Sequence, residues 1–570
     1  MRPLDETTPG VLVCHLGYGS DATKAAIAVV PDRPFTAELH GPSGVSVLRP
    51  GPVERVPGWS GGPWSRIPLP ELLAEGTYRV RVAGDGVDVW SEPFVVGPER
   101  LQRQTMSDVL AYFKAMRSSG EIDRKDRAAR LWGDTSGATV DARGGWLDAS
   151  GDTSKFLSHL TYTSAMSPQQ IPLCAWAMMA ARDELAAYRP ALVPVLGARL
   201  RDEALWGADF LTRFRSPEGY FYTGIFDALT KRLEERYITA PLQNSVRTPR
   251  YQAAYRHGAG LAIAALARAS TLEDDGDHPR ATYLTAAHEA FTHLEQHNPT
   301  YLFDHTENLL DDYTALLATT ELTAAEAAVS SAAAEAARRR ASSVIGRYER
   351  PGDGPGWFRV DGAGRPFFHA VEPGLPVIAL LRFAEVLPGA PEAGAAREIA
   401  VRVMVDVVER TAGVVNPFGY PRGLVQPLGG EPREGFFFPH ANETGYWWQG
   451  ENAAIASLSA AASACARLDG LSDDTRARLR VFADDQLAWI AGRNPFDSSM
   501  LQGRGRNNAD YSSDFPNLPG GIVNGVTSGW ADEQDLAFLP ADAPAGDAWR
   551  WAEQWIPHTG WFLLAVAAAH

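Results

Sequence analysis

The sequence has few cysteines and no long apolar segment. Only three of its 570 residues are cysteine, Cys14, Cys174 and Cys465, and no two of them have the spacing of a metal-ligand pair. An odd number of widely separated cysteines is typical of free thiols in a reducing compartment. No apolar run approaches the ~20 residues that a bilayer-spanning helix needs, and the first six residues lack the apolar core of a signal peptide. The sequence therefore predicts a cytoplasmic protein that has no membrane partner.

Basic residues are outnumbered by acidic ones, 53 against 69. The formal net charge is −16 and the isoelectric point is near 5.3, whereas a protein that binds a polyanion needs a basic surface. Nucleic acid is therefore excluded as the principal partner. A composition of 45% hydrophobic and 21% charged residues is that of a folded globular chain. Because 570 residues exceed one ordinary core, we expect two domains.

The segment from about residue 10 to residue 97 carries strand signals. In the stretch 77–82, Tyr78, Val80 and Val82 alternate with polar residues, which is the period of a half-buried strand. Clusters of glycine and proline at 41–42, 50–52 and 61–63 divide the segment into short pieces. This pattern predicts a small antiparallel β-sandwich over residues 1–98.

The pattern changes to long alanine-rich helices at about residue 101. Ile455, Leu458, Ala462 and Cys465, for example, recur at helical spacing and form one apolar stripe. At ~35–40 residues for a helix and its loop, the remainder of the chain would hold roughly twelve helices. The sequence thus predicts an all-α second domain over residues 99–570.

A glycine-flanked loop in this second domain contains two close carboxylates. Its sequence is Gly144-Gly145-Trp146-Leu147-Asp148-Ala149-Ser150-Gly151-Asp152. Close carboxylates repel each other unless backbone N–H groups or a metal hold them, and hydrolysis of an acetal needs a carboxylate that deprotonates a water molecule. A catalytic pair is one interpretation, and a helix cap or a calcium site is the other.

The loop resembles the Gly-Gly-Trp-Tyr-Asp-Ala-Gly-Asp catalytic segment of glycoside hydrolase family 9, the inverting cellulase family, with Ser150 as one extra residue. Residues 15–18 and 24–29 are similar to the opening strands of the immunoglobulin-like domain in that family. Residues 491–499 resemble its Leu-Gly-Arg-Asn-Pro segment, and residues 520–525 its glycine-rich loop. The resemblance implies an immunoglobulin-like sandwich followed by an (α/α)6 barrel with inverting O-glycoside hydrolase activity.

The same resemblance implies a set of catalytic residues. Asp152 matches the general base of the family, Asp148 the aspartate that helps to hold the nucleophilic water, and Glu553 the proton donor. Trp551 and Trp555 flank Glu553, and desolvation beside them would raise the pKa of its carboxyl group. The alternative acid is Glu451. It is predicted at a helix N-terminus, where free N–H groups keep a carboxylate ionised, so we expect it to bind substrate or to cap the helix.

Sugar rings pack on aromatic side chains and bond to polar groups through their hydroxyls. We expect such contacts from a set of aromatic, histidine and acidic residues, although each of them could instead belong to the core or, for Glu451, cap a helix: Trp146, Tyr446, Trp447, Trp448, Trp555, His257, His369, Glu451 and Asp510. Asp510 lies in the segment 506–511, which stands where family cellulases carry a His-His-Arg motif. Glu451 and Asp510 could pair with the 2-amino group of a glucosamine unit.

Together these features predict an enzyme that cleaves β-1,4-linked gluco-configured oligosaccharides. We expect exo-action on short imported substrates, of the β-glucosidase or exo-β-glucosaminidase type. An endo-acting cellulase, an oligosaccharide phosphorylase and a non-catalytic sugar-binding protein are the alternatives. No cofactor is required by this chemistry. Structural calcium would be in keeping with the family, and the segment 532–535 is the candidate for it. The oligomeric state stays open.

Overall fold

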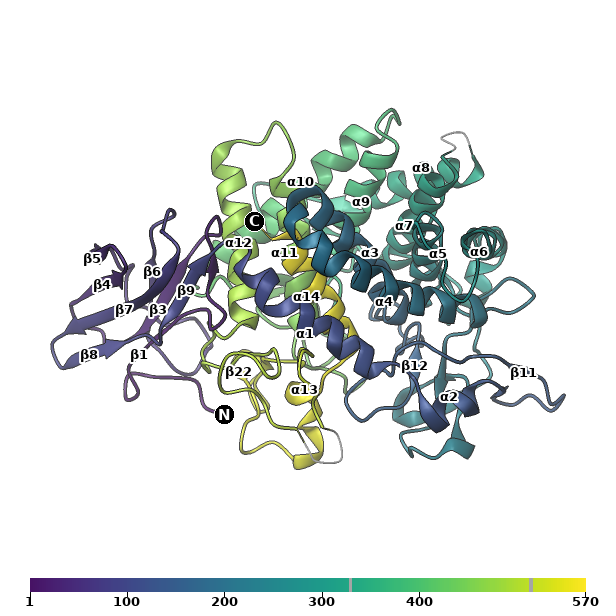
Figure 1. The fold of residues 1–570 in the computed structure, drawn as a ribbon, viewed down its shortest axis with the longest axis horizontal. Helices are drawn as coiled ribbons and strands as arrows, with labels where there is room; N and C mark the ends of the chain where they lie inside the picture. The colour runs from purple at the N-terminus through teal and green to yellow at the C-terminus, as the bar shows by residue number, and fades with distance from the viewer. Residues whose placement is uncertain (328–330, 512–515, 570) are drawn as a thin grey trace.

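The computed structural model describes residues 1–327, 331–511 and 516–569. A β-sandwich lies against one side of a larger helical domain (Figure 1). The sandwich has one sheet of order β1-β3-β6 and a second of order β2-β9-β7-β4-β5, in which β8 pairs with β7. Its strands are β1 (Gly10–Leu12), β2 (Tyr18–Gly19), β3 (Ala25–Val29), β4 (Phe35–Gly41), β5 (Gly44–Leu48), β6 (Trp64–Pro68), β7 (Gly76–Gly84), β8 (Val87–Trp90) and β9 (Phe94–Gly97). Tyr78, Val80 and Val82 on β7 are buried, as their alternation predicts.

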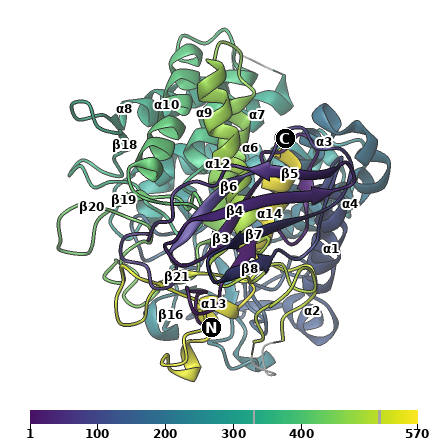
Figure 2. The same ribbon diagram turned by 90° about the vertical axis from the view of Figure 1, so that its left-hand side faces the viewer.

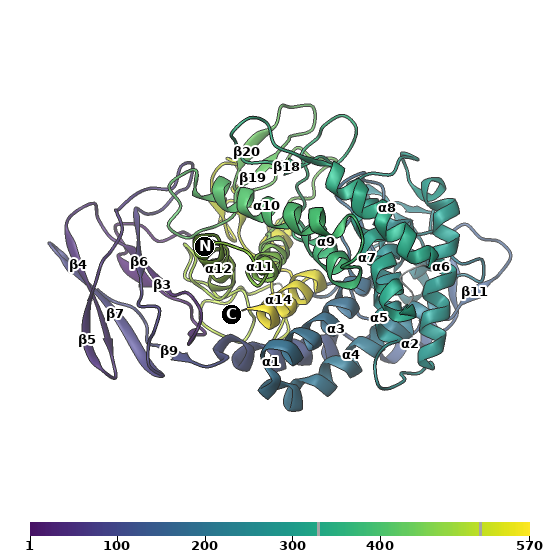
Figure 3. The same ribbon diagram turned by 90° about the horizontal axis from the view of Figure 1, so that it is seen from above.

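Twelve long helices build the second domain within the described residues. They are α1 (Arg100–Met116), α3 (Ile171–Tyr188), α4 (Val193–Arg213), α5 (Ala259–Ala269), α6 (Arg280–Tyr301), α7 (Leu309–Glu326), α8 (Ala332–Gly346), α9 (Leu375–Val386), α10 (Ala393–Ala412), α11 (Asn452–Ala466), α12 (Asp473–Ile490) and α14 (Ile556–Ala568). Helices α3, α5, α7, α9, α11 and α14 contact one another in a closed ring, and the other six pack outside it (Figure 3). The predicted (α/α)6 barrel is confirmed.

Inner and outer helices differ in their sequence pattern for a physical reason. An inner helix contacts neighbours on every side, and all residues of α14 and all but one of α11 are buried. An outer helix buries one face only, so α1 alternates buried residues such as Met106, Val109 and Phe113 with exposed ones. The last helix, α14, is thereby a core element.

The loops of the second domain also contain short strands. A mixed sheet of order β11-β10-β14-β13-β12 lies in the loops in front of the inner helices. Its strands have two or three residues each, too few to show a period of two in the sequence. The short elements are α2 (Gly120–Asp126), β10 (Ala129–Leu131), β11 (Thr139–Val140), β12 (Lys155–Phe156), β13 (Gly224–Phe226), β14 (Tyr237–Ile238), and the hairpins β15–β16 (Ala240–Pro241, Arg247–Thr248), β17–β18 (Tyr348–Glu349, Trp357–Phe358), β19–β20 (Gly423–Val425, Arg433–Gly435) and β21–β22 (Thr527–Ser528, Leu536–Ala537).

One expectation from composition is met by the described residues. Cys14, Cys174 and Cys465 are buried free thiols, as their odd number predicts. None of the helices in the described ranges combines the length and the apolar character needed to cross a bilayer.

The sandwich and the barrel are joined by a buried ionic contact. Asp485 on α12 accepts hydrogen bonds of 2.9 Å from Nη1 and Nη2 of Arg66 on β6, and a further one from Arg493. Arg493 also donates to the carbonyl of Ala25 on β3 at 3.2 Å. The Arg-Asn-Pro segment is therefore an interface element, and Figure 2 shows the sandwich strands in front of α12.

We expect Asp485→Ala to lower the free energy of unfolding by about 3–5 kcal/mol, because it leaves two guanidinium groups without their buried counter-ion. Thermal unfolding and limited proteolysis between the domains measure the effect. Asp88→Ala is the control, since Asp88 pairs with Arg81 on the solvent-exposed side of the sandwich. Equal unfolding midpoints for the two variants would contradict this role of Asp485.

Candidate active site

The loops that precede the inner helices enclose a cavity of about 340 Å³ on one face of the barrel. The three predicted catalytic carboxylates, Asp148, Asp152 and Glu553, all line it. Asp148 and Asp152 belong to the loop in front of β12 and α3, and Glu553 lies between the short helix α13 (Trp549–Ala552) and α14. Segments from near the start and from the end of the helical domain thus meet in one cavity.

Backbone hydrogen bonds join these two segments directly. The amide of Ser150 donates to the carbonyl of Gln554 at 2.8 Å, and the amide of Ile556 donates to the carbonyl of Asp148 at 3.1 Å. The Ser150 hydroxyl accepts from the Gln554 amide at 3.0 Å and donates to Asn517 at 2.9 Å. The extra residue of the loop is therefore part of the connection to the Glu553 segment.

Local contacts fix the direction of each aspartate. The amide of Ser154 donates to Oδ1 of Asp152 at 2.8 Å. The indole of Trp555 donates to Oδ1 of Asp148 at 3.1 Å, and the side-chain amide of Gln170 at the start of α3 donates to the same oxygen. One carboxylate is thus held by its own loop, and the other by residues next to α3 and α14.

Burial dominates the electrostatics of the three acids. Burial, followed by the charges of Asp152 and Asp148, raises the pKa of Glu553 well above its ordinary value. Burial and the charge of Asp152 likewise raise the pKa of Asp148 well above normal. The pKa of Asp152 is also raised by burial, but the hydrogen bond from Ser154 and the charge of Arg236 oppose this. Asp152 is therefore the acid that ionises most readily, and it faces a Glu553 that holds its proton.

A buried ion cluster supports the loop from behind. Arg236 donates to both oxygens of Asp126 at 2.9 and 2.8 Å and to the carbonyl of Thr153 at 2.6 Å. Lys155 pairs with the same Asp126 at 2.7 Å. The hydroxyl of Thr153 donates to Asp227, a fourth acid of the cavity, at 2.8 Å. Asp227 could not be predicted from the sequence, because it follows the three-residue strand β13 and belongs to no motif.

Aromatic side chains form the walls of the cavity. Of the predicted aromatic contacts, Tyr446, Trp447 and Trp555 line it. Arg550 holds the segment that contains the first two in place, because it donates to the backbone carbonyls of Tyr446 at 2.8 Å and Trp448 at 2.7 Å. Other lining residues were not predicted: His159, Tyr162, Gln449, Tyr511 and Trp549. Of these five residues, only Trp549 could have been predicted from the sequence, because it directly precedes the segment in which tryptophans flank Glu553.

Trp146 and Trp448 are core residues, which corrects two predicted sugar contacts. Trp146 is completely buried, and its indole donates to Glu203 at 2.8 Å. Its ring lies against Gly207 of α4, where a Cβ atom would collide with it. Trp448 is buried under His440, whose ring stacks on it at 3.8 Å. Trp447 and Trp448 are therefore adjacent in the sequence, but Trp447 lines the cavity and Trp448 lies in the core behind it.

Glu451, Asp510 and the two histidines also lie outside this cavity. Glu451 precedes α11 without capping it through its side chain, and burial raises its pKa to about 8, so the expected ionised carboxylate is wrong. Asp510 is exposed, whereas its neighbour Tyr511 lines the cavity. Burial lowers the pKa of His369 to about 3, and its Nδ1 accepts from the amides of the two residues that begin the turn into α9.

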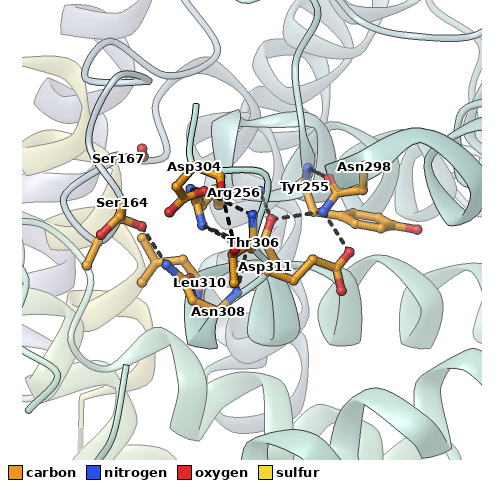
Figure 4. Close-up of polar contacts among 12 residues, drawn as sticks. Ser164, Ser167, Tyr255, Arg256, Asn298, Asp304, Thr306, Asn308, Leu310 and Asp311 are labelled. Atoms are coloured by element: carbon orange, nitrogen blue, oxygen red, sulfur yellow. Dashed lines mark hydrogen bonds and ion pairs between the residues drawn. The ribbon is translucent and has the colours of Figure 1, made fainter. Parts of the chain in front are cut away.

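His257 is held inside the barrel by its neighbour. Figure 4 shows Arg256 between Asp304 and Asp311, to which it donates at 2.7 and 3.1 Å. Asn308, which caps α7, donates to the carbonyl of Ser164 at 2.7 Å. These bonds tie the start of α5 to the start of α7, and burial lowers the pKa of His257 well below normal. The histidine itself is buried and does not line the catalytic cavity.

No group of three or more His, Cys, Asp or Glu side chains in the described ranges is arranged to hold a metal ion. In the candidate calcium segment, Asp532 accepts from the amide of Gln534 at 3.0 Å, and Asp535 accepts from the amide of Ser60 in the sandwich at 2.6 Å. Structural calcium stays a prediction.

Comparison with known proteins relates this geometry to a family. Residues 103–360 match the sequence profile of Glycosyl hydrolase family 9. No curated protein matches the chain. A solved structure described as Bacteroides ovatus GH9 is 16% identical, with 98% of each chain covered and a TM-score of 0.66.

Two further solved structures are similar. A metagenome-derived glycoside hydrolase family 9 endoglucanase is 16% identical, with 99% of this chain and 100% of that one covered and a TM-score of 0.66. Endoglucanase CelQ from Clostridium thermocellum, complexed with cellobiose and cellotriose, is 16% identical over 81% of this chain and 69% of that one, with a TM-score of 0.51. The first two likenesses extend over the sandwich as well as the barrel and show a shared fold.

Proposed function

We propose that this chain is an enzyme of glycoside hydrolase family 9, an inverting family of O-glycoside hydrolases whose profile residues 103–360 match, and that it hydrolyses short β-1,4-linked gluco-configured oligosaccharides from one chain end. Asp152 is the general base, Asp148 positions the water and Glu553 is the general acid. The observation that carries these roles is the backbone pairing of Ser150 with Gln554, which places all three acids on one cavity.

The chemistry follows from the protonation states. Glu553 holds a proton because burial raises its pKa, and it gives this proton to the glycosidic oxygen as the bond to the anomeric carbon breaks. Asp152 takes a proton from a water molecule, whose oxygen bonds to the anomeric carbon from the opposite face. Such a mechanism needs carboxyl groups ~6.5–9.5 Å apart and inverts the configuration. A β-linked substrate therefore gives an α-configured product.

The cavity supports a small saccharide substrate. Its volume of about 340 Å³ is near the lower end of the ~300–1,000 Å³ usual for small-molecule sites. Trp447, Trp549 and Trp555 offer ring faces for the C–H surfaces of sugars, and Gln449 offers an amide for hydroxyls. A β-1,4-gluco substrate is in keeping with the cellobiose and cellotriose bound to CelQ.

Exo-action is supported by a hairpin that limits the cavity. The tip of β15–β16, from Leu242 to Ser245, lines the cavity, and Gln243 lies so close to Gly445 that a Cβ atom there would collide with it. The hairpin and the loop that carries Tyr446 are therefore in contact. A polymer that passes through the site would need this contact to open. The alternative is an endo-acting enzyme, which the names of several similar structures favour.

The remaining alternatives have less support. A phosphorylase needs a cationic pocket for phosphate, whereas the described lining holds Asp148, Asp152, Asp227 and Glu553 against a single lysine, Lys231. Pairing of a glucosamine 2-amino group with Glu451 and Asp510 is not retained, because neither residue lines the cavity. A glucosaminidase would depend on Asp227 instead. We also propose a cytoplasmic location, which is supported by the sequence alone.

We expect Asp152→Asn and Glu553→Gln each to lower kcat by ~10²–10⁴-fold with folding intact, because each removes one proton-transfer group. Matched controls are Asp510→Asn and Glu451→Gln, which change acids outside the cavity and keep near-wild-type turnover. Rates are measured on cellobiose, cellotriose, and the nitrophenyl β-glucoside and β-glucosaminide.

NMR of the fresh product separates inversion from retention. An α-anomer is expected, and a β-anomer would refute the mechanism. Wild-type turnover in the Asp152 or Glu553 variant would overturn that residue's role.

The pH dependence of kcat/KM tests the electrostatics. Activity falls as the pH drops through the pKa of Asp152 and again as it rises through the raised pKa of Glu553. Since the charge of Asp227 raises the pKa of Asp152, Asp227→Asn moves the acidic limb to lower pH. Asp510→Asn leaves the limb in place. If the acidic limb of the Asp227 variant stayed at the same pH or moved to higher pH, this coupling would be contradicted.

Replacement of residues 242–246 by Asn-Gly shortens the β15–β16 hairpin and tests exo-action. We expect the shortened variant to lower the viscosity of carboxymethyl cellulose, because a chain could then pass through the site, while the wild type does not. Val246→Ala, which keeps the hairpin length and the Gln243 contact, is the control. A rapid fall in viscosity with the wild type would establish endo-action instead.

A further inference from the structure

A second cavity of about 110 Å³ lies beside the catalytic one and shares none of its lining residues. It is bounded by α10 and α11, by the segment 367–373 that precedes α9, and by the hairpins β17–β18 and β19–β20, which Figure 3 shows next to these helices. Its wall is largely aromatic, with contributions from Phe358, Phe367, Phe368, Phe436, Phe437 and Phe438. This volume is of the same order as the apolar cavity of about 150 Å³ that binds benzene, so the ligand is limited to one six-membered ring.

Several polar groups in this wall have incomplete hydrogen bonding, and Glu451 and Tyr420 are the two among them that carry oxygen atoms. Glu451 is 9% exposed, and its Oε1 accepts from the amide of Phe438 at 3.2 Å. Its other oxygen has no hydrogen-bond partner among the described residues. The hydroxyl of Tyr420 is likewise buried without a partner in the described part of the chain. Tyr420 and Glu451 both line this cavity, and burial followed by the charge of Glu451 raises the pKa of Tyr420 well above its ordinary value. Buried polar groups of this kind favour a ligand that completes their bonds.

Charge around the cavity selects a neutral ligand. Burial raises the pKa of Glu451 to about 8, so the acid is protonated at neutral pH. Arg410 and Arg422 also line the cavity, and both pair with Glu434, at 3.2 and 3.1 Å. Two guanidinium groups and a neutral acid disfavour an ammonium group. A hydroxyl donates one hydrogen bond and accepts another, which matches what Tyr420 and Glu451 offer.

We propose that this second cavity binds a small aromatic molecule that carries one hydroxyl group. The ring packs among the phenylalanines, and the hydroxyl lies between Tyr420 and Glu451. From the sandwich, Trp59 packs behind this wall, with ring centroids 6.1 Å from Tyr420 and 6.3 Å from Phe437. Both domains therefore shape the site. The proposal does not rest on the glycosidase activity, because the two cavities are separate.

The test is a ¹⁹F NMR titration of the whole protein with 4-fluorobenzyl alcohol, with 4-fluorotoluene as the apolar match. We expect saturable binding of the alcohol. Tyr420→Phe weakens the alcohol about fivefold, as loss of one hydrogen bond predicts, and leaves the toluene unchanged. Glu451→Gln keeps an acceptor for the Phe438 amide and a donor for the ligand, so the affinity for the alcohol stays within about twofold.

Ala454, a buried residue of α11 in this wall, provides the blocking variant. Ala454→Leu fills the cavity and abolishes binding of both probes while oligosaccharide turnover persists, and Leu424→Trp serves if that variant does not fold. Glu553→Gln retains probe binding, which separates this site from the catalytic one.

Several results would overturn the proposal. They are absence of saturable binding, displacement of the probe by cellobiose, or equal loss of both probes in Tyr420→Phe. Tighter binding of 4-fluorobenzylamine that disappears in Glu451→Gln would also overturn it, because the acid would then be a counter-ion for a cation.

Discussion

The pairing of residues 148–150 with residues 554–556 is the constraint on which the active site depends. It joins segments that are 404 residues apart in the chain through backbone hydrogen bonds. The barrel makes this pairing possible, because the ring of inner helices closes between α14 and α3. The loops in front of these two helices are thereby neighbours, and each brings its carboxylates to the same cavity.

Three acids in one cavity repel one another, and the surrounding contacts decide which of them ionises. Gln170 and Trp555 bond to Asp148, while Ser154 and the charge of Arg236 favour the ionised form of Asp152. Glu553 is raised in pKa by burial and by the two aspartates. The division of roles between acid and base therefore arises from position, since all three side chains carry the same functional group.

Local periodicity predicted the strands of the sandwich and the amphipathic helices, and the length of the chain predicted roughly twelve helices. The three candidate acids were identified by resemblance to family motifs and, for Glu553, also by the tryptophans beside it. Side-chain direction was not predictable. Trp146 and Trp447 both stand near glycines, yet Gly207 makes room for the first in the core, and the second lines the cavity. Glu451 shows a second limit, since burial at a helix start outweighed the N–H groups that favour its charge.

The order of the chain has a consequence for synthesis. On the ribosome, the loop with Asp148 and Asp152 emerges long before the segment 554–556 that pairs with it. Until that segment and α14 are made, the ring of helices is incomplete. A chain in which α14 is not yet made therefore has no complete cavity. The proposed catalytic site forms only once α14 takes its place between α11 and α3.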